Sequence, residues 1–328
     1  MTIAEPILSA RDLHVWFDLG EGRELHAVRG FDIDLYPGER MGLVGESGCG
    51  KTTAILALMG LLPASASVAG QVVLEGEDIL ARGEDSMSPH RWHEIAMVFQ
   101  GAMNAFNPVK RVGAQIVEPM ELHGTASGRE ARQRAGDLLE MVGIGRDRAN
   151  RYPHEFSGGM RQRAAIAMAL ACSPKVLLAD EPTTALDVMV QAQILELLVS
   201  LTKDLGLAMI LVTHDLPVVA QACTRASVMY AGEVVERGST ATLYHEPRHP
   251  YTRMLFAATP DLWGDEDVIS IAGTPPRLDH EPVGCPFAPR CDSAFEPCAT
   301  RAPKPIRVGD RHDAACHLNE REIAGATT

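Results

Sequence analysis

The chain has no excess of positive charge and no apolar segment long enough to cross a bilayer. Its 328 residues carry 30 Lys and Arg against 43 Asp and Glu, which gives a formal net charge of −13. This balance argues against binding nucleic acid through general electrostatic attraction. The best apolar run, residues 164–172, is far shorter than the roughly 18 residues of a transmembrane helix. It is more typical of one buried helix.

The first ten residues contain Glu5 and lack a basic segment followed by a long apolar run. We therefore expect no secretory signal and a cytosolic chain, in which any work at a membrane depends on other subunits for the spanning. The length suggests about two domains.

Cysteine is scarce in the first 240 residues, where Cys49, Cys172 and Cys223 stand alone, but four cysteines crowd the tail. Their spacing, C-x5-C-x6-C-x17-C, lacks the tight C-x2-C knuckles of many zinc sites. It therefore favours a [4Fe–4S] cluster, with zinc as the alternative. His312 and His317 are possible substitute ligands, and free thiols or disulfides are the other readings. The proposed ligands are Cys285, Cys291, Cys298 and Cys316.

Strand and helix patterns alternate through most of the chain, which predicts an α/β fold with a mostly parallel sheet. Short alternating runs in residues 7–35 predict antiparallel strands. The tail after residue 240 is rich in proline and is predicted to be mainly loop. The remaining predicted strands are 40–44, 72–74, 96–99, 176–179, 208–213, 226–230 and 233–236, and the predicted helices are 51–62, 116–122, 129–142, 160–172 and 188–205.

A glycine-rich stretch directly after a predicted strand fits the phosphate-loop pattern. Its glycines permit close backbone approach, and successive N–H groups at a helix start attract phosphate. Lys51 is expected to reach the β- and γ-phosphates, and Thr52 to ligate Mg²⁺. An ordinary glycine turn is disfavoured by the strand before it and the helix after it. The stretch reads Gly45, Glu46, Ser47, Gly48, Cys49, Gly50, Lys51, Thr52, and Thr53 follows it.

A short apolar strand ends in two carboxylates, Asp180 and Glu181. Asp180 is the expected Mg²⁺ partner, and Glu181 is placed to polarise a water that attacks the γ-phosphate. Gln100 follows another predicted strand and is a candidate to touch Mg²⁺ or the attacking water.

A second glycine turn, Ser157-Gly158-Gly159, opens a helix between these two motifs. Its free N–H groups and the serine hydroxyl predict a second anion site, although a plain glycine turn with a serine cap has the same pattern. One nucleotide rarely needs two such sites, so the second is predicted to serve a nucleotide held by another subunit. His214, at a strand end, is a candidate γ-phosphate contact. Phe17, or with less support Trp16, is a candidate to stack on adenine.

Taken together, these motifs resemble those of the ATP-binding cassette ATPases. Gly45 to Thr52 looks like Walker A, Val176 to Glu181 like Walker B, and Ser157 to Gln162 like the signature motif. Gln100 resembles the Q-loop glutamine, Asp187 the D-loop aspartate and His214 the switch histidine. The signature carries Phe156 and Met160 where many members have leucine and glutamine.

The resemblance implies a RecA-like P-loop NTPase core with an antiparallel β subdomain, an inserted helical subdomain and a loop-rich C-terminal extension. The expected boundaries are 1–102 and 157–240 for the core, 103–156 for the helical subdomain and 241–328 for the extension. It further implies catalytic roles for Glu181, His214 and Gln100, and Mg²⁺ contacts from Thr52, Gln100 and Asp180. The residues expected to face a partner's ATP are Ser157, Gly158, Gly159, Met160 and Gln162.

The tail segments 249–253 and 284–291 resemble the C-terminal extension of dipeptide and oligopeptide permease ATPases. That resemblance implies ATP hydrolysis that drives peptide import. The implied partners are a second ATPase in a heterodimer, two transmembrane permease subunits and an extracytoplasmic peptide-binding protein. The implied location is the cytoplasmic face of the inner membrane.

Three other functions remain open at this point. An importer ATPase for nickel, sugar or antimicrobial peptide would share these motifs, because this subunit does not touch the cargo. A soluble cassette protein acting on DNA or ribosomes would tend to carry two cassettes, coiled coils or basic tracts, which are not seen here. A non-hydrolysing regulatory subunit would usually lack Glu181 or His214.

Overall fold

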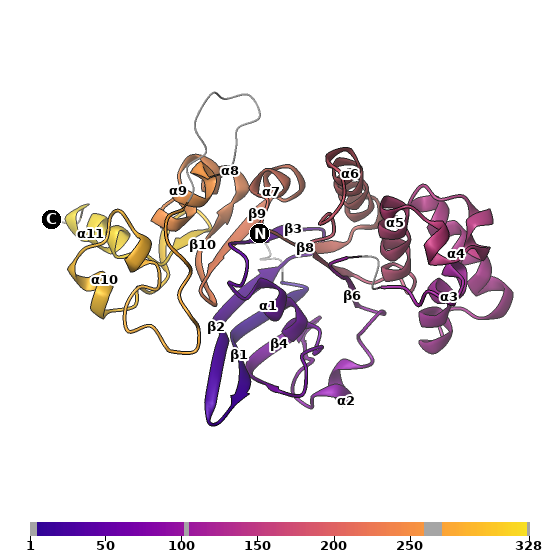
Figure 1. Ribbon diagram of the computed structural model, residues 1–328, viewed down its shortest axis with the longest axis horizontal. Helices are drawn as coiled ribbons and strands as arrows, with labels where there is room; N and C mark the ends of the chain where they lie inside the picture. Colours follow the sequence, from indigo (N-terminus) through magenta and orange to yellow (C-terminus); the bar gives the residue numbers. More distant parts are fainter. Residues whose placement is uncertain (1–4, 102–104, 259–270, 327–328) are drawn as a thin grey trace. The chain divides into compact units, whose positions relative to one another are not determined.

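The computed structural model describes residues 5–101, 105–258 and 271–326. It divides into two compact units (Figure 1). Unit 1 takes its described residues from 1–8, 35–40 and 73–211, and unit 2 takes them from 9–34, 41–72 and 212–328.

Unit 1 is built on three neighbouring strands in the order β8-β7-β6. They are β6 (Ile95–Val98), β7 (Val176–Asp180) and β8 (Ala208–Thr213). Every residue of the three is buried, which explains why they read as continuous apolar runs rather than alternating ones. Strands β6 and β7 run parallel, and Val98 pairs with Ala179. Residues just after these positions therefore emerge at the same sheet edge.

The helices of unit 1 include a group of three, α3, α4 and α5, that pack on one another at the right of Figure 1. A long helix, α6, is capped at its start by Asp187. It ends just before Gly206, whose left-handed φ of 66° stops it. The bounds are α2 (Glu84–Met87), α3 (Val112–Leu122), α4 (Gly128–Met141), α5 (Gly158–Ala169) and α6 (Val188–Leu205), with short 3₁₀ turns η1 (Arg146–Asn150) and η2 (Pro153–Glu155).

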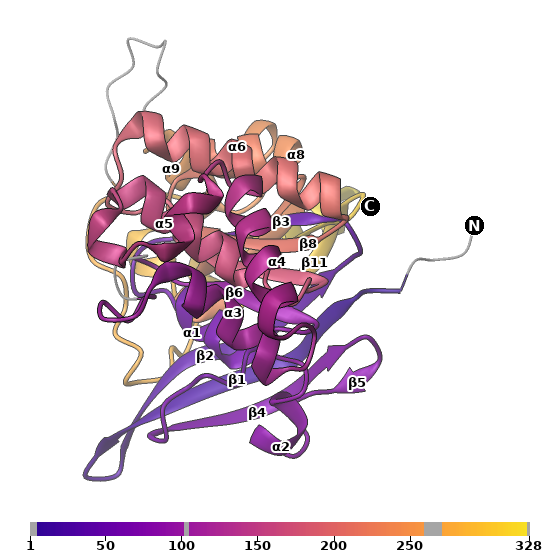
Figure 2. The same cartoon turned by 90° about the vertical axis from the view of Figure 1, so that its right-hand side faces the viewer.

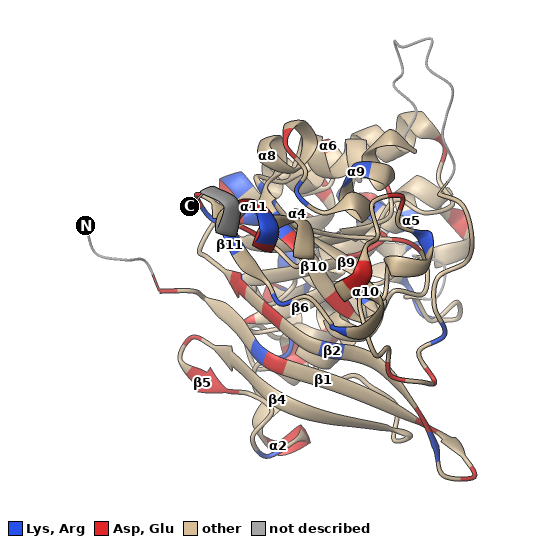
Figure 3. Ribbon diagram, turned by 90° about the vertical axis from the view of Figure 1, so that its left-hand side faces the viewer, with Lys and Arg blue, Asp and Glu red and all other residues tan. Residues whose placement is uncertain are grey.

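Unit 2 contains the long strands β1 (Leu8–Gly20) and β2 (Arg23–Leu35), with β4 (Ala66–Leu74) beside β1 (Figure 2). The last two residues of β4, Val73 and Leu74, belong to unit 1 and pair with the short β5 (Glu77–Asp78) of that unit. Acidic and basic residues are interspersed along β1 and β2 (Figure 3), and Arg11 of β1 forms an ion pair with Asp34 of β2. The view shows no concentrated basic stripe on these strands, in line with the acidic composition.

The second sheet of unit 2 has the strand order β11-β12-β10-β9-β3. Its β3 (Arg40–Val44) runs parallel to β9 (Arg225–Tyr230), and β10 (Glu233–Ser239) is antiparallel to β9. The edge strands β11 (Ile306–Gly309) and β12 (His312–Ala314) come from the C-terminal extension. The extension therefore continues the sheet that carries the phosphate loop.

The helical elements of unit 2 are α1 (Lys51–Leu58), α7 (Leu216–Ala222), α8 (Thr240–His245), α9 (Pro250–Ala257), η3 (Ala288–Arg290), α10 (Glu296–Thr300) and α11 (His317–Ala326). In the described parts of the chain, no helix combines the length and apolar character needed to cross a membrane.

Two sequence expectations need correction. The helix that begins at Lys51 ends at Leu58 rather than residue 62, because Met59 caps it and Gly60 turns away with a φ of 59°. The tail is less loop-rich than its prolines suggested. Several of them occupy the first turn of a helix, as Pro250 and Pro297 do, where the missing N–H costs nothing.

Candidate functional site

The phosphate loop joins β3 to α1 in unit 2, and its glycines are required by the backbone. Gly45 and Gly50 have φ values of 153° and 102°. A Cβ at Gly45 would lie 2.1 Å from the Met229 carbonyl oxygen, and one at Gly50 would lie 2.5 Å from the Ala27 carbonyl oxygen. Only glycine fits such close backbone approach at positive φ. The loop geometry therefore supports a backbone-lined anion site at the start of α1.

Lys51 is folded over the loop. Its Nζ donates to the carbonyl oxygens of Gly45 at 2.7 Å and Glu46 at 2.9 Å, and the residue is 5% exposed. The Cys49 thiol lies 3.7 Å from the same ammonium, and burial raises the pKa of Cys49. The thiol is thus a neutral packing group beside the lysine.

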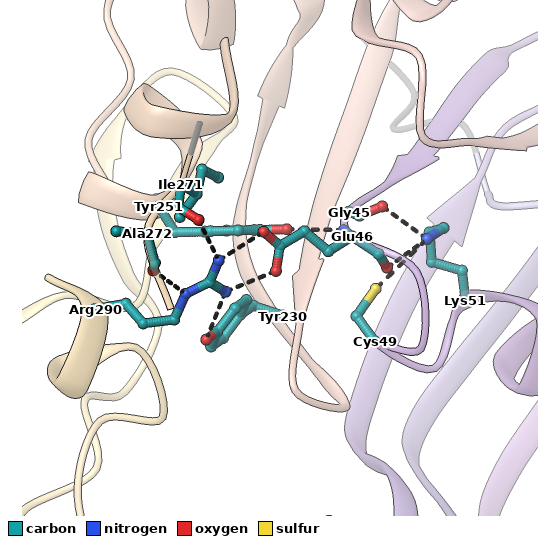
Figure 4. Close-up of polar contacts among 9 residues, drawn as sticks. All are labelled: Gly45, Glu46, Cys49, Lys51, Tyr230, Tyr251, Ile271, Ala272 and Arg290. Carbon is teal, nitrogen blue, oxygen red and sulfur yellow. Dashed lines mark hydrogen bonds and ion pairs between the residues drawn. The ribbon is translucent and has the colours of Figure 1, made fainter. Parts of the chain in front are cut away.

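Glu46 is anchored by residues of the C-terminal extension (Figure 4). Its backbone N–H donates to the Tyr251 hydroxyl at 2.9 Å. Its carboxylate accepts from both terminal nitrogens of Arg290, at 2.7 and 2.9 Å. Sequence reasoning missed both partners, because Tyr251 and Arg290 lie more than 200 residues further along the chain. The one indication of these residues in the sequence is that both lie in the tail segments that resemble a permease ATPase extension.

In unit 1, Gln100 and Glu181 come together. The Gln100 Nε2 donates to Glu181 Oε2 at 2.8 Å, and the Thr184 hydroxyl donates to the same oxygen at 2.8 Å. The β6–β7 register explains this meeting, because each residue lies two positions beyond the paired Val98 and Ala179. The candidate base is thereby held in place by two donors at the carboxyl edge of the strands.

The candidate Mg²⁺ ligands are oxygen donors, as this cation prefers. Asp180 is 2% exposed at the end of β7, where a buried carboxylate is expected to be paired with a cation or donors. Because Gln100 uses its amide nitrogen toward Glu181, its amide oxygen is the atom suited to a cation. These two residues belong to unit 1, and Thr52 belongs to unit 2.

The turn at Ser157 begins α5 with the geometry expected of a helix cap. The Ser157 hydroxyl accepts from the Met160 N–H at 3.3 Å, and Ser157 is exposed. Gly159 faces α6, because a Cβ there would lie 2.6 Å from Val190 Cγ1, whereas one at Gly158 would have ordinary contact with Leu186. Gly159 is therefore required for helix packing, independently of any ligand.

Two other residues of this region, Gln162 and Asp187, differ in their local partners. Gln162 is 3% exposed, and its buried Nε2 has no hydrogen-bond partner within the described structure. Asp187 caps α6, since its side chain accepts from the Val190 N–H at 3.0 Å. The segment between Glu181 and Asp187 has positive φ at Glu181 (42°) and Ala185 (65°). Such backbone strain is common at functional sites.

Three predicted nucleotide contacts lie in unit 2. His214 is exposed immediately after β8. On β1, Phe17 is half-buried, while the Trp16 ring stacks with the rings of His14 and His26 at centroid distances of 5.3 and 4.6 Å, and the two histidine rings also contact each other. Trp16 is thus occupied by its neighbours, which leaves Phe17 as the predicted adenine contact.

The structure does not support a metal site among the tail cysteines. The seven cysteines are free thiols, and within the described residues no group of three or more His, Cys, Asp or Glu side chains is arranged to hold a metal. Burial raises the pKa of Cys316 to about 11; the other three tail cysteines also raise it, while a hydrogen bond from the Leu318 backbone lowers it. The arrangement of the described residues therefore gives a metal centre at these cysteines no support.

The two substitute ligands are also engaged elsewhere. The His312 Nε2 lies 2.7 Å from Glu236 Oε1. Both ring nitrogens of His317 have partners, Glu320 at 3.0 Å and the Arg301 carbonyl oxygen at 2.8 Å.

Comparison with known proteins shows the family of this chain. Residues 28–184 match the ABC transporter family, and residues 235–298 match the C-terminal region of oligopeptide/dipeptide transporters. The dipeptide transport ATP-binding protein DppD of Bacillus subtilis is 44% identical over 328 residues, covering 98% of this chain and 97% of that protein. The chain belongs to the ABC transporter ATP-binding proteins.

The match to this family extends over nearly the whole chain. The oligopeptide transport ATP-binding protein OppD of Escherichia coli is 45% identical over 303 residues, covering 92% of this chain and 90% of that protein. A solved dimeric ATP-binding cassette in a post-hydrolysis state with ADP and phosphate has a TM-score of 0.64 and 29% identity, and it covers 71% of this chain and 98% of its own. This ABC protein is therefore an ATPase with the expected α/β cassette fold.

Proposed function

We propose that this ABC ATPase powers the import of dipeptides or oligopeptides through separate membrane subunits. The observation that carries hydrolysis is the Glu181 carboxylate, held by Gln100 and Thr184 at the carboxyl edge of the strands. The peptide substrate is supported by relatives named for dipeptide and oligopeptide transport and by the match of residues 235–298.

In the proposed reaction, the amides of residues 45–52 and Lys51 bind the triphosphate. Glu181 takes a proton from the attacking water as it approaches the γ-phosphate, and Gln100 orients Glu181. Bound Mg²⁺ would neutralise phosphate charge, with Thr52, Gln100 and Asp180 as the residues that hold it. His214 is proposed to contact the γ-phosphate and Phe17 the adenine.

The Ser157 turn is proposed to contact ATP bound by a second, similar ATPase subunit, together with Gly158, Met160 and Gln162. Two ATP molecules would then join two such subunits, and hydrolysis would separate them. Membrane permeases, a peptide-binding protein and a position at the cytoplasmic face of the membrane complete the proposed assembly.

The decisive variant is Glu181→Gln. We expect ATP turnover to fall at least about a hundredfold, since a positioned general base contributes at least that factor, while ATP still binds. Turnover is measured as phosphate release and binding by titration of the same preparation. Hydrolysis at the wild-type rate would overturn the assignment of Glu181.

The four tail cysteines remain our proposed ligands for a [4Fe–4S] cluster, with zinc as the alternative, on their spacing alone. The thiol geometry described above gives this proposal no support, and no step of the reaction depends on it.

A further inference from the structure

We propose that Arg290 and Tyr251 are positioning residues that set the affinity of the phosphate loop for ATP. This inference rests on the proposed ATP site and adds a role for the C-terminal extension in the energetics of nucleotide binding. It starts from Glu46, the second residue of the loop, whose polar groups are held from two directions (Figure 4).

All three kinds of polar group on Glu46 have partners. Its N–H donates to the Tyr251 hydroxyl, its carbonyl accepts from Lys51, and its carboxylate accepts two hydrogen bonds from Arg290. The orientation of this peptide determines where the following amides point. Those amides form the anion-binding nest. Fixing Glu46 therefore pre-organises the loop before ATP arrives.

Arg290 is itself held rigidly. Its Nε donates to the Ala272 carbonyl at 2.9 Å, and its terminal nitrogens also reach the Tyr230 hydroxyl at 3.2 Å and the Ile271 carbonyl at 3.3 Å. Its side chain is only 5% exposed. The hydrogen bonds to Glu46 raise the pKa of Arg290 further above its ordinary value. The guanidinium is thus a permanent charge in a fixed place.

Tyr251 is equally constrained. It is fully buried, and its ring packs against Tyr230 and Phe287 at centroid distances of 4.5 and 5.3 Å. Burial raises the pKa of Tyr251 above its ordinary value. The hydroxyl therefore stays neutral, with an oxygen able to accept from the Glu46 amide.

The ion pair between Glu46 and Arg290 also affects the electrostatics of ATP binding. A carboxylate at the entrance of a loop that binds a triphosphate would repel its ligand. The bidentate contact with Arg290 neutralises that charge and directs it away from the loop. Arg290 thus has two separable effects, holding the loop and cancelling the charge of Glu46.

A purely architectural ion pair would give a different result. It would attach the extension to the rest of unit 2, so its loss would lower the stability without changing the ATP affinity of the folded protein. The test must therefore measure affinity and include a variant that removes the charge of Glu46.

The experiment measures the dissociation constant for MgATP by calorimetric titration of the full-length chain, with Glu181→Gln as the background that prevents turnover. Arg290→Ala should weaken MgATP binding about tenfold, the effect typical of losing a charge-assisted contact. MgADP should be affected less, because it carries less charge. Adding Glu46→Gln to Arg290→Ala should bring MgATP affinity back to about threefold below the background. The recovered part reports the charge of Glu46, and the part still missing reports the loop that Arg290 no longer holds.

The matched control is Arg237→Ala, which removes an ion pair with Asp313 in the same unit and should leave affinity unchanged. If Arg290→Ala does not fold, Arg290→Lys and Tyr251→Phe provide the same test. We expect each of these variants to weaken MgATP binding by a smaller factor of about threefold. Background affinity in the Arg290 and Tyr251 variants, or full recovery of affinity in the double variant, would overturn the inference, because these residues would then not position the loop. Lys51→Ala distinguishes failure of this inference from failure of the proposed function. If Lys51→Ala binds ATP normally, the proposed ATP site itself is wrong.

Discussion

Ser157 combines a local structural role with the intersubunit role that we propose for it. Its hydroxyl caps α5 by accepting from the Met160 N–H, and its exposed position leaves it accessible to a nucleotide on another subunit. Substitution at the neighbouring Gly159 cannot isolate the second role, because any Cβ there collides with Val190.

A substitution that keeps the cap isolates that role. We predict that Ser157→Asp lowers the ATPase rate of the assembled transporter by more than about tenfold, because a carboxylate repels the partner's phosphates. Aspartate is as good a helix cap as serine, so unfolding free energy should change by less than about 0.5 kcal/mol. The measurements are steady-state phosphate release and urea unfolding.

The control is Ser157→Asn, which also caps helices but adds no charge. It should lower the ATPase rate less than Ser157→Asp does, because it adds no charge. Full activity in Ser157→Asp would show that this turn does not approach a phosphate.

At the scale of elements, the start of α9 depends on a buried histidine that must stay neutral. The His249 Nδ1 accepts from the Tyr251 N–H at 3.0 Å, while Glu236 accepts from the His249 N–H at 2.9 Å. Burial lowers the pKa of His249 from 6.5 to about 4, which outweighs the opposing influence of Glu236. Protonation would remove the acceptor that caps the helix carrying Tyr251.

This arrangement predicts a pH dependence of stability. Because the folded pKa lies below the unfolded value, the stabilisation is fully present above about pH 6.5 and is lost as pH falls toward 4. The loss has an upper bound of about 3 kcal/mol. Urea unfolding of the full chain between pH 7 and pH 4.5 measures it.

His249→Asn provides the matched comparison, because asparagine can cap the helix but does not titrate in this range. The free energy of unfolding of His249→Asn should decline less steeply with falling pH than that of the wild type. The difference in slope corresponds to the uptake of up to one proton per molecule on unfolding. Equal slopes in the two proteins would contradict the assigned role of His249.

The same scale shows what periodicity can and cannot predict. The bounds of α6 and β8 agree with the sequence prediction, because an apolar stripe and a wholly buried run are strong local signals. The sequence prediction gave the C-terminal extension too little regular secondary structure. Its strand β12 is short and contains His312 and Asp313, and it pairs with β10 on one side and with β11 on the other.

At the scale of the whole molecule, the metal content of the purified protein decides whether the cysteine spacing has a function. The [4Fe–4S] proposal predicts a brown protein, when purified without oxygen, with about four iron and four sulfide per chain. The zinc alternative predicts about one zinc and no iron. Elemental analysis that finds neither would leave the cysteines as free thiols, in agreement with the structure of the described residues.

The candidate site was predictable to different degrees in its parts. Within each predicted motif the residues follow one another directly in the sequence, so residue types and order were enough to predict it. These motifs are the phosphate loop, the Asp180-Glu181 strand end and the Ser157 turn. The contact between Gln100 and Glu181 follows from strand register and could be expected only in outline. The partners of His312 and His317 were not predictable, since an isolated histidine does not reveal its neighbours.

The sequence by itself determined the chemistry of the phosphate loop, because backbone amides, glycines and one lysine act within eight consecutive positions. Tertiary structure alone decided how the loop is held. Glu46 and Arg290 are separated by 244 positions, and neither residue type indicates the other. Their pairing arises because the extension continues the sheet of unit 2 and returns a buried guanidinium to the loop, where an unpaired carboxylate would oppose phosphate binding.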